Sequence, residues 1–188
     1  MRYILASKSP RRRELLTRII PEFEIITREV DESLPADVHP RDGVGLLAIR
    51  KGEAVVPLVG DGAIVISSDT LVEYKGVALG KPTDVEDAKR MLRTLSGVKH
   101  NVHTGVAVHY KGRCYSGVSS TAVEFLELSD ETIETYVACG EPMDKAGAYG
   151  IQGLGGKLVK GYFGDYNTVV GLSLELTEWL IGEALKDD

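Results

Sequence analysis

The 188-residue sequence lacks the features that mark secreted and membrane proteins. It contains two cysteines, Cys114 and Cys139, which stand far apart, so neither a disulfide framework nor a cysteine metal site is indicated. No apolar run approaches the ~18–20 residues that span a bilayer, and the apolar stretch at the N-terminus is too short for a signal peptide. We therefore expect a cytoplasmic protein without a membrane partner.

An excess of positive charge is also lacking. The chain carries 28 acidic and 22 basic side chains, a formal net charge of −6, so the protein as a whole repels polyanions. No aromatic stripe accompanies the basic run from Arg11 to Arg13. We therefore expect no nucleic-acid partner, and any bound phosphate must sit in a local basic pocket.

Glycine, in contrast, is abundant. The 21 glycines are about 11% of the chain against a typical ~7%, which suggests that the backbone comes close to a neighbouring segment or a ligand. With 43% hydrophobic and 27% charged residues the composition is that of a globular protein. No repeat or linker divides the sequence, so we predict one domain over residues 1–188.

The predicted elements indicate an α/β protein with a mixed twisted sheet, because hairpins occur beside strand–helix alternation. Strands are expected over residues 3–6, 23–30, 63–67, 101–110, 113–128 and 158–162, with turns at 75–76 and 111–112. Helices are expected from Pro10, over 42–56, from Thr83 to Gly97, over 129–138 and around Trp179.

Several side chains carry more specific expectations. Thr83 and Glu86 have the spacing of a capping box. Cys114 is expected in the core, whereas His100 and His103, three apart in a strand, should face opposite ways and have structural or solvated roles. The core face of the helix over 42–56 is predicted to consist of Leu46, Leu47, Ile49 and Ala54.

The first candidate site is the segment from Ser7 to Arg13, where a strand leads into a helix. Helix N-terminal amides, hydroxyls and guanidinium groups together favour an anion, typically phosphate. Three cations at the positive end of a helix are unfavourable unless an anion is bound there. The alternative is a capped surface helix with solvated arginines.

The second candidate site is the polar run from Ser67 to Thr70, expected at the carboxyl end of an apolar strand. Ligands of open α/β sheets bind at such ends, and Asp69 could hold a divalent cation or take a proton from water. Lys81 could return a cation to this place, and Asp31 and Glu32 supply further oxygens. The alternative is that Asp69 forms a turn or a cap.

The third candidate site is the glycine-rich stretch from Asp144 to Gly156. Its glycines let the backbone approach a ligand, and Lys145 and Gln152 offer donors. The stretch lacks the spacing of a Walker loop or a dinucleotide fingerprint, so an irregular loop is the alternative.

Five blocks of the sequence together resemble the Maf family of nucleoside triphosphate pyrophosphatases in order and spacing, over nearly the full chain. The blocks are ILASKSPRRRELL, SSDTLVEYKGVALGKP, MLRTLSGVKHNVHTGVAV, EPMDKAGAYGIQGLGG and GDYNTVVGL. The resemblance implies an α/β fold like that of inosine triphosphatase, with a mixed twisted sheet, flanking helices and a substrate cleft between two lobes. It also implies a cytoplasmic homodimer that uses Mg²⁺, Mn²⁺ or Co²⁺ to hydrolyse a nucleoside triphosphate to the monophosphate and pyrophosphate.

Three positions resemble the branch of the family that acts on dTTP and UTP. These are Arg11, Thr70 and Gln152, where the 7-methyl-GTP branch would carry Trp, Gln and Glu. Neutral donors and acceptors suit a pyrimidine edge, whereas an aromatic ring and a carboxylate suit a cationic methylated purine. Ser68 departs from the family, which more often has a small apolar residue there, and is expected to add a hydroxyl beside the metal site.

The resemblance also implies roles for the site residues. Asp69 would activate water as a general base or position it through the metal, and Glu32 would help to bind that metal. Phosphates would be held by Ser7, Arg12, Lys51 and Lys81, and the base or sugar would be selected by Arg11, Thr70 and Gln152. Two alternatives are a broader pyrophosphatase that removes CTP or modified pyrimidine nucleotides, and a nucleotide-binding regulator of cell division and septum formation.

Overall fold

A computed structural model describes residues 1–186, and one seven-stranded mixed sheet forms its centre. The strands are β1 (Arg2–Leu5), β2 (Glu24–Ile25), β3 (Ala63–Tyr74), β4 (Val77–Leu79), β5 (Lys99–Tyr110), β6 (Arg113–Phe125) and β7 (Val159–Phe163). Their order is β2-β1-β3-β5-β6-β7, and β4 also pairs with β3. β1 runs parallel to β2 and β3, and the other pairs are antiparallel. The mixed sheet expected from the sequence is confirmed.

Helices cover this sheet on both faces. The α-helices are α1 (Pro10–Thr17), α2 (Pro40–Glu53), α3 (Val56–Val59), α4 (Val85–Leu95), α5 (Asp130–Ala138), α6 (Tyr166–Val170) and α7 (Leu174–Lys186). Three short 3₁₀ helices are η1 (Glu141–Asp144), η2 (Ala146–Ala148) and η3 (Leu154–Leu158). No helix within residues 1–186 is long and apolar enough to cross a bilayer.

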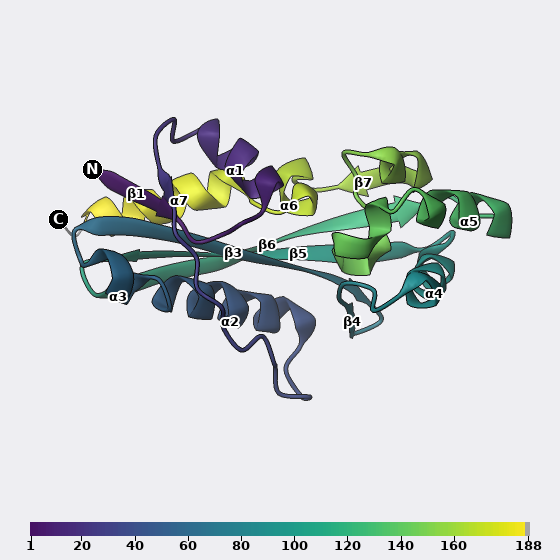
Figure 1. The fold of residues 1–188 in the computed structure, drawn as a ribbon, viewed down its shortest axis with the longest axis horizontal. Coiled ribbons are helices and arrows are strands. Elements are labelled where there is room, and N and C mark those ends of the chain that lie inside the picture. The colour runs from purple at the N-terminus through teal and green to yellow at the C-terminus, as the bar shows by residue number, and fades with distance from the viewer. Residues whose placement is uncertain (187–188) are drawn as a thin grey trace.

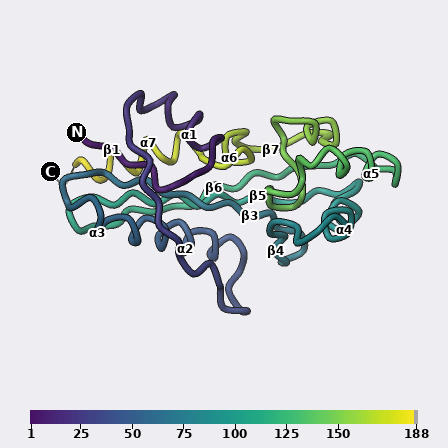
Figure 2. The backbone as a smooth tube through the Cα atoms, in the orientation of Figure 1, coloured from purple at the N-terminus to yellow at the C-terminus, as the bar shows by residue number. Residues whose placement is uncertain are grey.

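The molecule is elongated because β3, β5 and β6 run along most of its length (Figures 1 and 2). At the end that holds both termini, α1, α6 and α7 lie on one face of the sheet and α2 and α3 on the other. The opposite end carries α4, α5 and the 3₁₀ helices.

Separate apolar cores fill the two ends. One core lies under α4 and α5 and contains Leu92, Phe125 and Ile133. The core under α1 and α7 contains Leu16, Ile66 and other side chains from the same face of the sheet, and a smaller one lies on the α2 and α3 face. The two ends are the two lobes expected from the sequence. They share one sheet because the three long strands pass through both of them.

Helix α2 packs unusually close to the sheet because glycines occupy the contact. A Cβ on Gly105 of β5 would collide with the carbonyl of Val44 in α2. A Cβ on Gly52 would collide with the ring of His109. These glycines cost conformational entropy, but they let α2 pack closely against β3 and β5.

Local capping and turn signals mark several boundaries correctly. Ser9 caps α1 and Ser129 caps α5, as expected. The cap of α4 is Asp84 rather than Thr83, because the Asp84 carboxylate accepts from the amide of Asp87 at 2.8 Å.

Expectations that depended on distant partners were wrong in places. The strand expected over 23–30 is two residues long, since its one partner is the end of β1. Leu46 is 42% exposed because α2 turns Val44, Leu47 and Ala48 to the sheet instead. Cys114 lies exposed in β6 rather than in the core.

Candidate functional site

The candidate site lies halfway along β3, where the sheet has a local gap. β1 pairs with β3 only as far as Ile66, and β4 joins the same edge of β3 at Val72. β3 continues through this gap because β5 pairs with it from Val65 to Glu73. The sequence placed Asp69 at the end of a strand, and that expectation was wrong because the pairing with β5 extends the strand.

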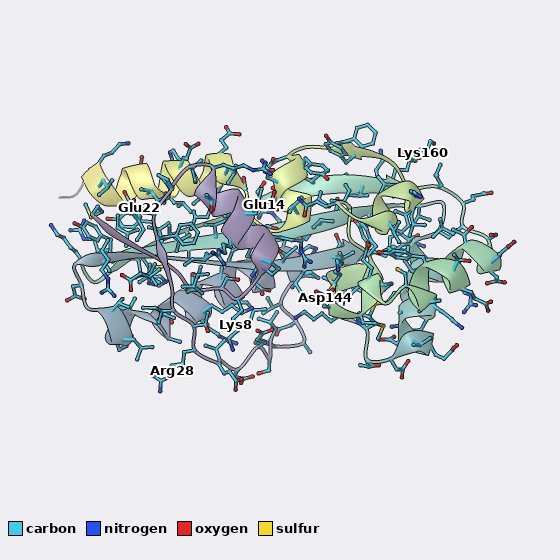
Figure 3. All side chains as sticks on the ribbon, turned by 45° about the horizontal axis from the view of Figure 1, so that its top comes forward. Lys8, Glu14, Glu22, Arg28, Asp144 and Lys160 are labelled. Atoms are coloured by element: carbon cyan, nitrogen blue, oxygen red, sulfur yellow. The ribbon has the colours of Figure 1, made fainter. Side chains whose placement is uncertain are left out.

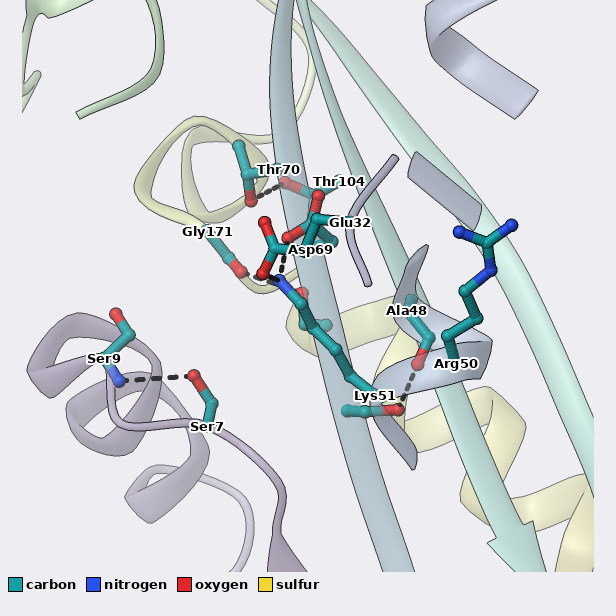
Figure 4. Close-up of polar contacts among 12 residues, drawn as sticks. Ser7, Ser9, Glu32, Ala48, Arg50, Lys51, Asp69, Thr70, Thr104 and Gly171 are labelled. Carbon is teal, nitrogen blue, oxygen red and sulfur yellow. Dashed lines mark hydrogen bonds and ion pairs between the residues drawn. The ribbon is translucent and has the colours of Figure 1, made fainter. Parts of the chain in front are cut away.

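On the face of β3 that is covered by α2, one lysine joins two carboxylates (Figure 4). Lys51, in the last turn of α2, donates to Oδ1 of Asp69 at 2.5 Å and lies 2.9 Å from Oε1 of Glu32. The side chains of Lys51 and Asp69 are 17% and 10% exposed, whereas that of Glu32 is 60% exposed. Two carboxylates from different segments are therefore directed at one cation.

The position of Lys51 follows from the seating of α2. The Ser67 hydroxyl of β3 donates to the carbonyl of Ala48 at 2.7 Å. The close approach at Gly52, next in sequence to Lys51, holds the last turn against His109. This lysine therefore stands on a rigid helix end rather than on a loop.

On the opposite face of β3, the guanidinium of Arg12 ties α1 to the sheet. Nη1 donates to the carbonyl of Ser68 at 2.8 Å and to the hydroxyl of Ser7 at 3.4 Å. Nε donates to the carbonyl of Gly171 at 2.8 Å, and Nη2 to the hydroxyl of Thr70 at 3.1 Å. Burial lowers the pKa of Arg12, and the negative charge of Asp69 opposes that shift. Four of its five N–H groups are thus used within the protein.

The Thr70 hydroxyl belongs to a directed chain. Thr104 donates to the carbonyl of Thr168 at 2.7 Å, so its only hydroxyl proton is used. The 2.9 Å contact between the two threonine hydroxyls must therefore be donated by Thr70. Thr70 consequently uses its proton on Thr104 and a lone pair on Arg12.

The Ser68 hydroxyl faces away from Asp69. It is fully buried and donates to the carbonyl of Gly171 at 3.0 Å, at the end of α6. Successive side chains in a strand point to opposite faces, so Ser68 and Asp69 cannot share a site on the α2 face. The expected hydroxyl beside the metal site is therefore a wrong expectation.

The phosphate-binding segment predicted before α1 has the expected helix start. Ser9 accepts from the amide of Arg12 at 3.4 Å, and the Ser7 hydroxyl accepts from the amide of Ser9 at 3.2 Å. Arg11 lies 3.8 Å from a carboxylate oxygen of Asp144 in η1, so α1 and the other lobe meet here. Lys8 and Asp144 stand on these two lobes in Figure 3.

The glycine-rich stretch is organised by Glu141, which the sequence did not single out. Its carboxylate accepts from Tyr136 at 2.8 Å and from the amides of Leu154 and Gly155 at 2.9 and 3.0 Å. Burial by itself would raise the pKa of Glu141, but these donors outweigh it and hold the pKa below its usual value. Gln152 lies exposed in a turn of this stretch.

The residue before Lys81, Gly80, contacts the glycine-rich stretch through its backbone. The amide of Gly147 donates to the carbonyl of Gly80 at 3.0 Å, while the Lys81 side chain is exposed. Within residues 1–186, no hydrogen bond or ion pair joins Lys81 or Gln152 to Asp69.

The structure therefore brings some of the predicted residues together and leaves others apart. Glu32, Lys51 and Asp69 form one cluster, and Ser7, Arg12 and Thr70 form a second on the other face of β3. Arg11 contacts the other lobe. In the described part of the chain, no three His, Cys, Asp or Glu side chains are grouped as a metal centre. His100 and His103 are buried and bonded to Tyr149 and Ser120 respectively.

Two residues of the second cluster were missed from the sequence. Thr104 and Gly171 approach Thr70 and Arg12 from β5 and from the end of α6. The period-two alternation of β3 could have shown that Thr70 and Asp69 face opposite ways. No local signal connects β3 to residues so distant in the chain.

Comparison with known proteins assigns a family. Residues 2–184 match the model of the family described as Maf-like protein. A dTTP/UTP pyrophosphatase of Thermococcus kodakarensis is 47% identical over 180 residues, which cover 96% of this chain and 95% of the relative. A dTTP/UTP pyrophosphatase of Vibrio cholerae is 48% identical over 178 residues, 95% of each chain.

Solved structures resemble the chain more distantly. A nucleoside-triphosphatase or dITP/XTP pyrophosphatase from Mycobacterium abscessus matches 99% of this chain and 96% of its own, with 14% identity and a TM-score of 0.45. The Staphylococcus aureus Ham1 protein gives the same TM-score over 66% of this chain and 72% of its own.

Proposed function

Since the chain belongs to the family of Maf-like proteins, we propose that it is a dTTP/UTP pyrophosphatase. The reaction cleaves the bond between the α- and β-phosphates with water and releases the nucleoside monophosphate and pyrophosphate. The observation that carries this proposal is the Lys51 ammonium held between Asp69 and Glu32, because it brings a proton acceptor and a cation to the same place.

The surroundings of Asp69 support a role for it as the general base. Its Oδ1 is held by Lys51, and Oδ2 has no hydrogen-bond partner among the described residues. A water that donates to Oδ2 could lose its proton as it attacks phosphorus. Lys51 holds Oδ1 in place, which leaves Oδ2 as the oxygen that would accept that proton.

The two carboxylates fit a divalent cation. Mg²⁺ is commonly held by one or two carboxylates together with substrate phosphates, and Glu32 and Asp69 already converge on one positive charge. When bound, Mg²⁺, Mn²⁺ or Co²⁺ would neutralise phosphate charge and make water a better nucleophile. Lys51 would then be free to turn to a phosphate oxygen.

We assign the remaining predicted residues to phosphate binding and substrate selection. Lys81 and Lys51 would bring positive charge from the two sides of Asp69. Arg12 holds the Ser7 hydroxyl and has one N–H left, so this pair would bind a phosphate oxygen at the start of α1. Arg11, Thr70 and Gln152 would select the base or sugar.

Further parts of the proposal concern the whole protein. Residues 1–188 would act as one domain, because β3, β5 and β6 belong to both lobes, with substrate entering between them. The enzyme would act in the cytoplasm as a homodimer. Hydrolysis of modified pyrimidine nucleotides would make it a housecleaning enzyme.

The proposal is tested by pyrophosphate release from dTTP, UTP, CTP, 5-methyl-UTP and 7-methyl-GTP, each with Mg²⁺, Mn²⁺ and Co²⁺. We expect dTTP and UTP to be preferred. Comparable hydrolysis of CTP would indicate the broader pyrophosphatase, and preference for 7-methyl-GTP would overturn the choice of branch. Tight binding of dTTP without pyrophosphate release with any metal would favour the regulator of cell division.

The role of Asp69 is tested by Asp69→Asn, which keeps the shape of the side chain but cannot act as a base. Turnover should fall by at least ~10²-fold. The matched control is Asp61→Asn in the exposed turn before β3, which should leave turnover unchanged. Near wild-type turnover of Asp69→Asn would remove Asp69 from the mechanism.

A further inference from the structure

The backbone of Thr70 faces the gap in the sheet. Alternate residues of a strand direct their N–H and C=O groups to the same edge. The Ile66 carbonyl accepts from the amide of Ala6 on this edge, and the Ser68 carbonyl accepts from Arg12. Val72 pairs with β4 on the same edge. Thr70, with the same parity, must direct its N–H and C=O there as well.

Neither neighbouring strand reaches Ser68 or Thr70, but the Ser68 carbonyl has Arg12 as its donor, whereas the Thr70 backbone has no such partner among the described residues. β1 ends its pairing at Ile66 and β4 begins at Val72. Throughout residues 1–186, no hydrogen bond to the amide or carbonyl of Thr70 is formed on this edge. Thr70 is half-buried, and backbone amides and carbonyls shielded from water normally find partners, so a ligand is a natural partner here.

The Thr70 side chain is poorly placed to bind a ligand in this gap. Its proton is donated to Thr104, and Arg12 occupies one lone pair. The group at this position that offers both a donor and an acceptor to the gap is therefore the backbone.

The pair of groups fits a nucleobase better than a phosphate. A phosphate accepts hydrogen bonds and would be repelled by the Thr70 carbonyl, whereas a base edge can offer an acceptor beside a donor. The gap also lies between the lobes, which meet where Arg11 approaches Asp144 at 3.8 Å. Phosphates are better served by Lys51 and the start of α1.

We propose that the Thr70 backbone reads the pyrimidine base: its N–H donates to the 4-carbonyl and its C=O accepts from N3–H. This inference rests on the proposed function and names the group that gives it specificity. Uracil and thymine share the 4-carbonyl and N3–H. Cytosine reverses both, with an amino group at C4 and an acceptor at N3, so donor would face donor and acceptor would face acceptor.

The substrate side is tested on the wild-type enzyme with UTP, CTP and N3-methyl-UTP. Methylation removes the N3 donor and keeps the 4-carbonyl. The expected kcat/KM is lower for N3-methyl-UTP and for CTP than for UTP by about tenfold or more, because the Thr70 carbonyl loses its partner. Equal kcat/KM for UTP and N3-methyl-UTP would overturn the proposal.

The protein side is tested by replacing Thr70 with its α-hydroxy acid, which turns the backbone N–H into an ester oxygen and keeps the side chain. For this ester variant we expect a loss of about tenfold in kcat/KM for UTP and a smaller ratio of kcat/KM for UTP to that for CTP. A UTP analogue without the 4-carbonyl should be hydrolysed equally well by the wild type and the ester variant. A purely structural defect in the ester variant would instead lower kcat/KM for UTP and for the analogue alike.

The control for the side chain is Thr70→Val, which removes the hydroxyl and keeps the backbone N–H. Its UTP to CTP ratio should match the wild type even if turnover changes. If the ester variant keeps the wild-type ratio of kcat/KM for UTP to that for CTP, the backbone role is wrong. If the ester variant does not fold, the comparison of UTP with N3-methyl-UTP on the wild type decides. Absence of pyrophosphate release from every nucleotide would instead reject the proposed function.

Discussion

Lys51 and Asp69 form a short ion pair across the α2 and β3 interface, with Nζ 2.5 Å from Oδ1. The same Nζ lies 2.9 Å from Glu32, which comes from the loop before α2. Because both members of the pair are largely buried, removal of one leaves the other charge poorly compensated. The ammonium thus occupies the point between two carboxylates at which a divalent cation would bind.

Replacement of this ammonium should separate metal binding from turnover. Lys51→Met removes the competing positive charge, so Mn²⁺ should bind more tightly in the absence of nucleotide. Turnover of dTTP should nevertheless fall by at least ~10²-fold, because a charge that stabilises the reacting phosphates is lost. Mn²⁺ titration followed by electron paramagnetic resonance and steady-state pyrophosphate release measure the two effects.

The matched control for this prediction is Lys186→Met at the end of α7, where the lysine is exposed and pairs with Glu183. It should change neither Mn²⁺ affinity nor turnover. Weaker or unchanged Mn²⁺ binding by Lys51→Met would contradict a cation position shared between Lys51 and the metal.

The close packing of α2 predicts that Gly52→Ala is destabilising. The added Cβ would meet the His109 ring and lie 2.7 Å from the Ser67 hydroxyl, so the helix must shift. We expect a loss of about 1–3 kcal/mol in the free energy of unfolding. Turnover should also fall because Lys51 is the preceding residue, and urea unfolding with steady-state kinetics measures both.

The matched control is Gly182→Ala in α7, where a Cβ meets no atom within 4 Å. This substitution should stabilise the protein by roughly 0.5–1 kcal/mol, because alanine loses less backbone entropy in a helix. If Gly52→Ala were equally stabilising, the packing account of α2 would be wrong.

The sequence predicted best those elements whose signals are local. Ser9 with Pro10 marks the start of α1, and the turn at Lys111 and Gly112 joins β5 to β6 with positive φ at both residues. Such signals depend on side chains within one turn of the boundary. They are present in the sequence whatever the rest of the chain does.

The arrangement of the site depends on partners far along the chain. Asp69 lies in the middle of β3 because β5 pairs beyond it, and the gap exists because β1 and β4 end where they do. Glu141 is bound by the amides of Leu154 and Gly155, which no local pattern connects to it. The residue types of the site could be predicted from the sequence, but not which of them share a face.

His100 makes stability depend on pH. It lies in the core at the end of the sheet near α4, with Nε2 2.9 Å from the Tyr149 hydroxyl and its ring 5.0 Å from that of Phe125. Burial is the main cause that lowers its pKa from 6.5 to about 4. The unfolded chain therefore takes up a proton at a higher pH than the folded protein does.

The sign of the effect follows from this difference. Well above pH 6.5 the imidazole is neutral in both states and its contribution is complete, and as the pH falls through 6.5 towards 4 the unfolded chain is increasingly favoured. The full shift corresponds to about 3 kcal/mol, of which about 2 kcal/mol is lost by about pH 5. Urea unfolding at about pH 7 and pH 5 should show this loss in the wild type.

His100→Gln tests the assignment because glutamine is neutral at every pH used and can still bond to Tyr149. The variant should be less stable than the wild type at neutral pH, since it packs less well against Phe125. It should lose less stability on acidification, though not none, because burial also lowers the pKa of His103 and of His109. An equal loss in the two proteins would show that the acid sensitivity comes from groups other than His100.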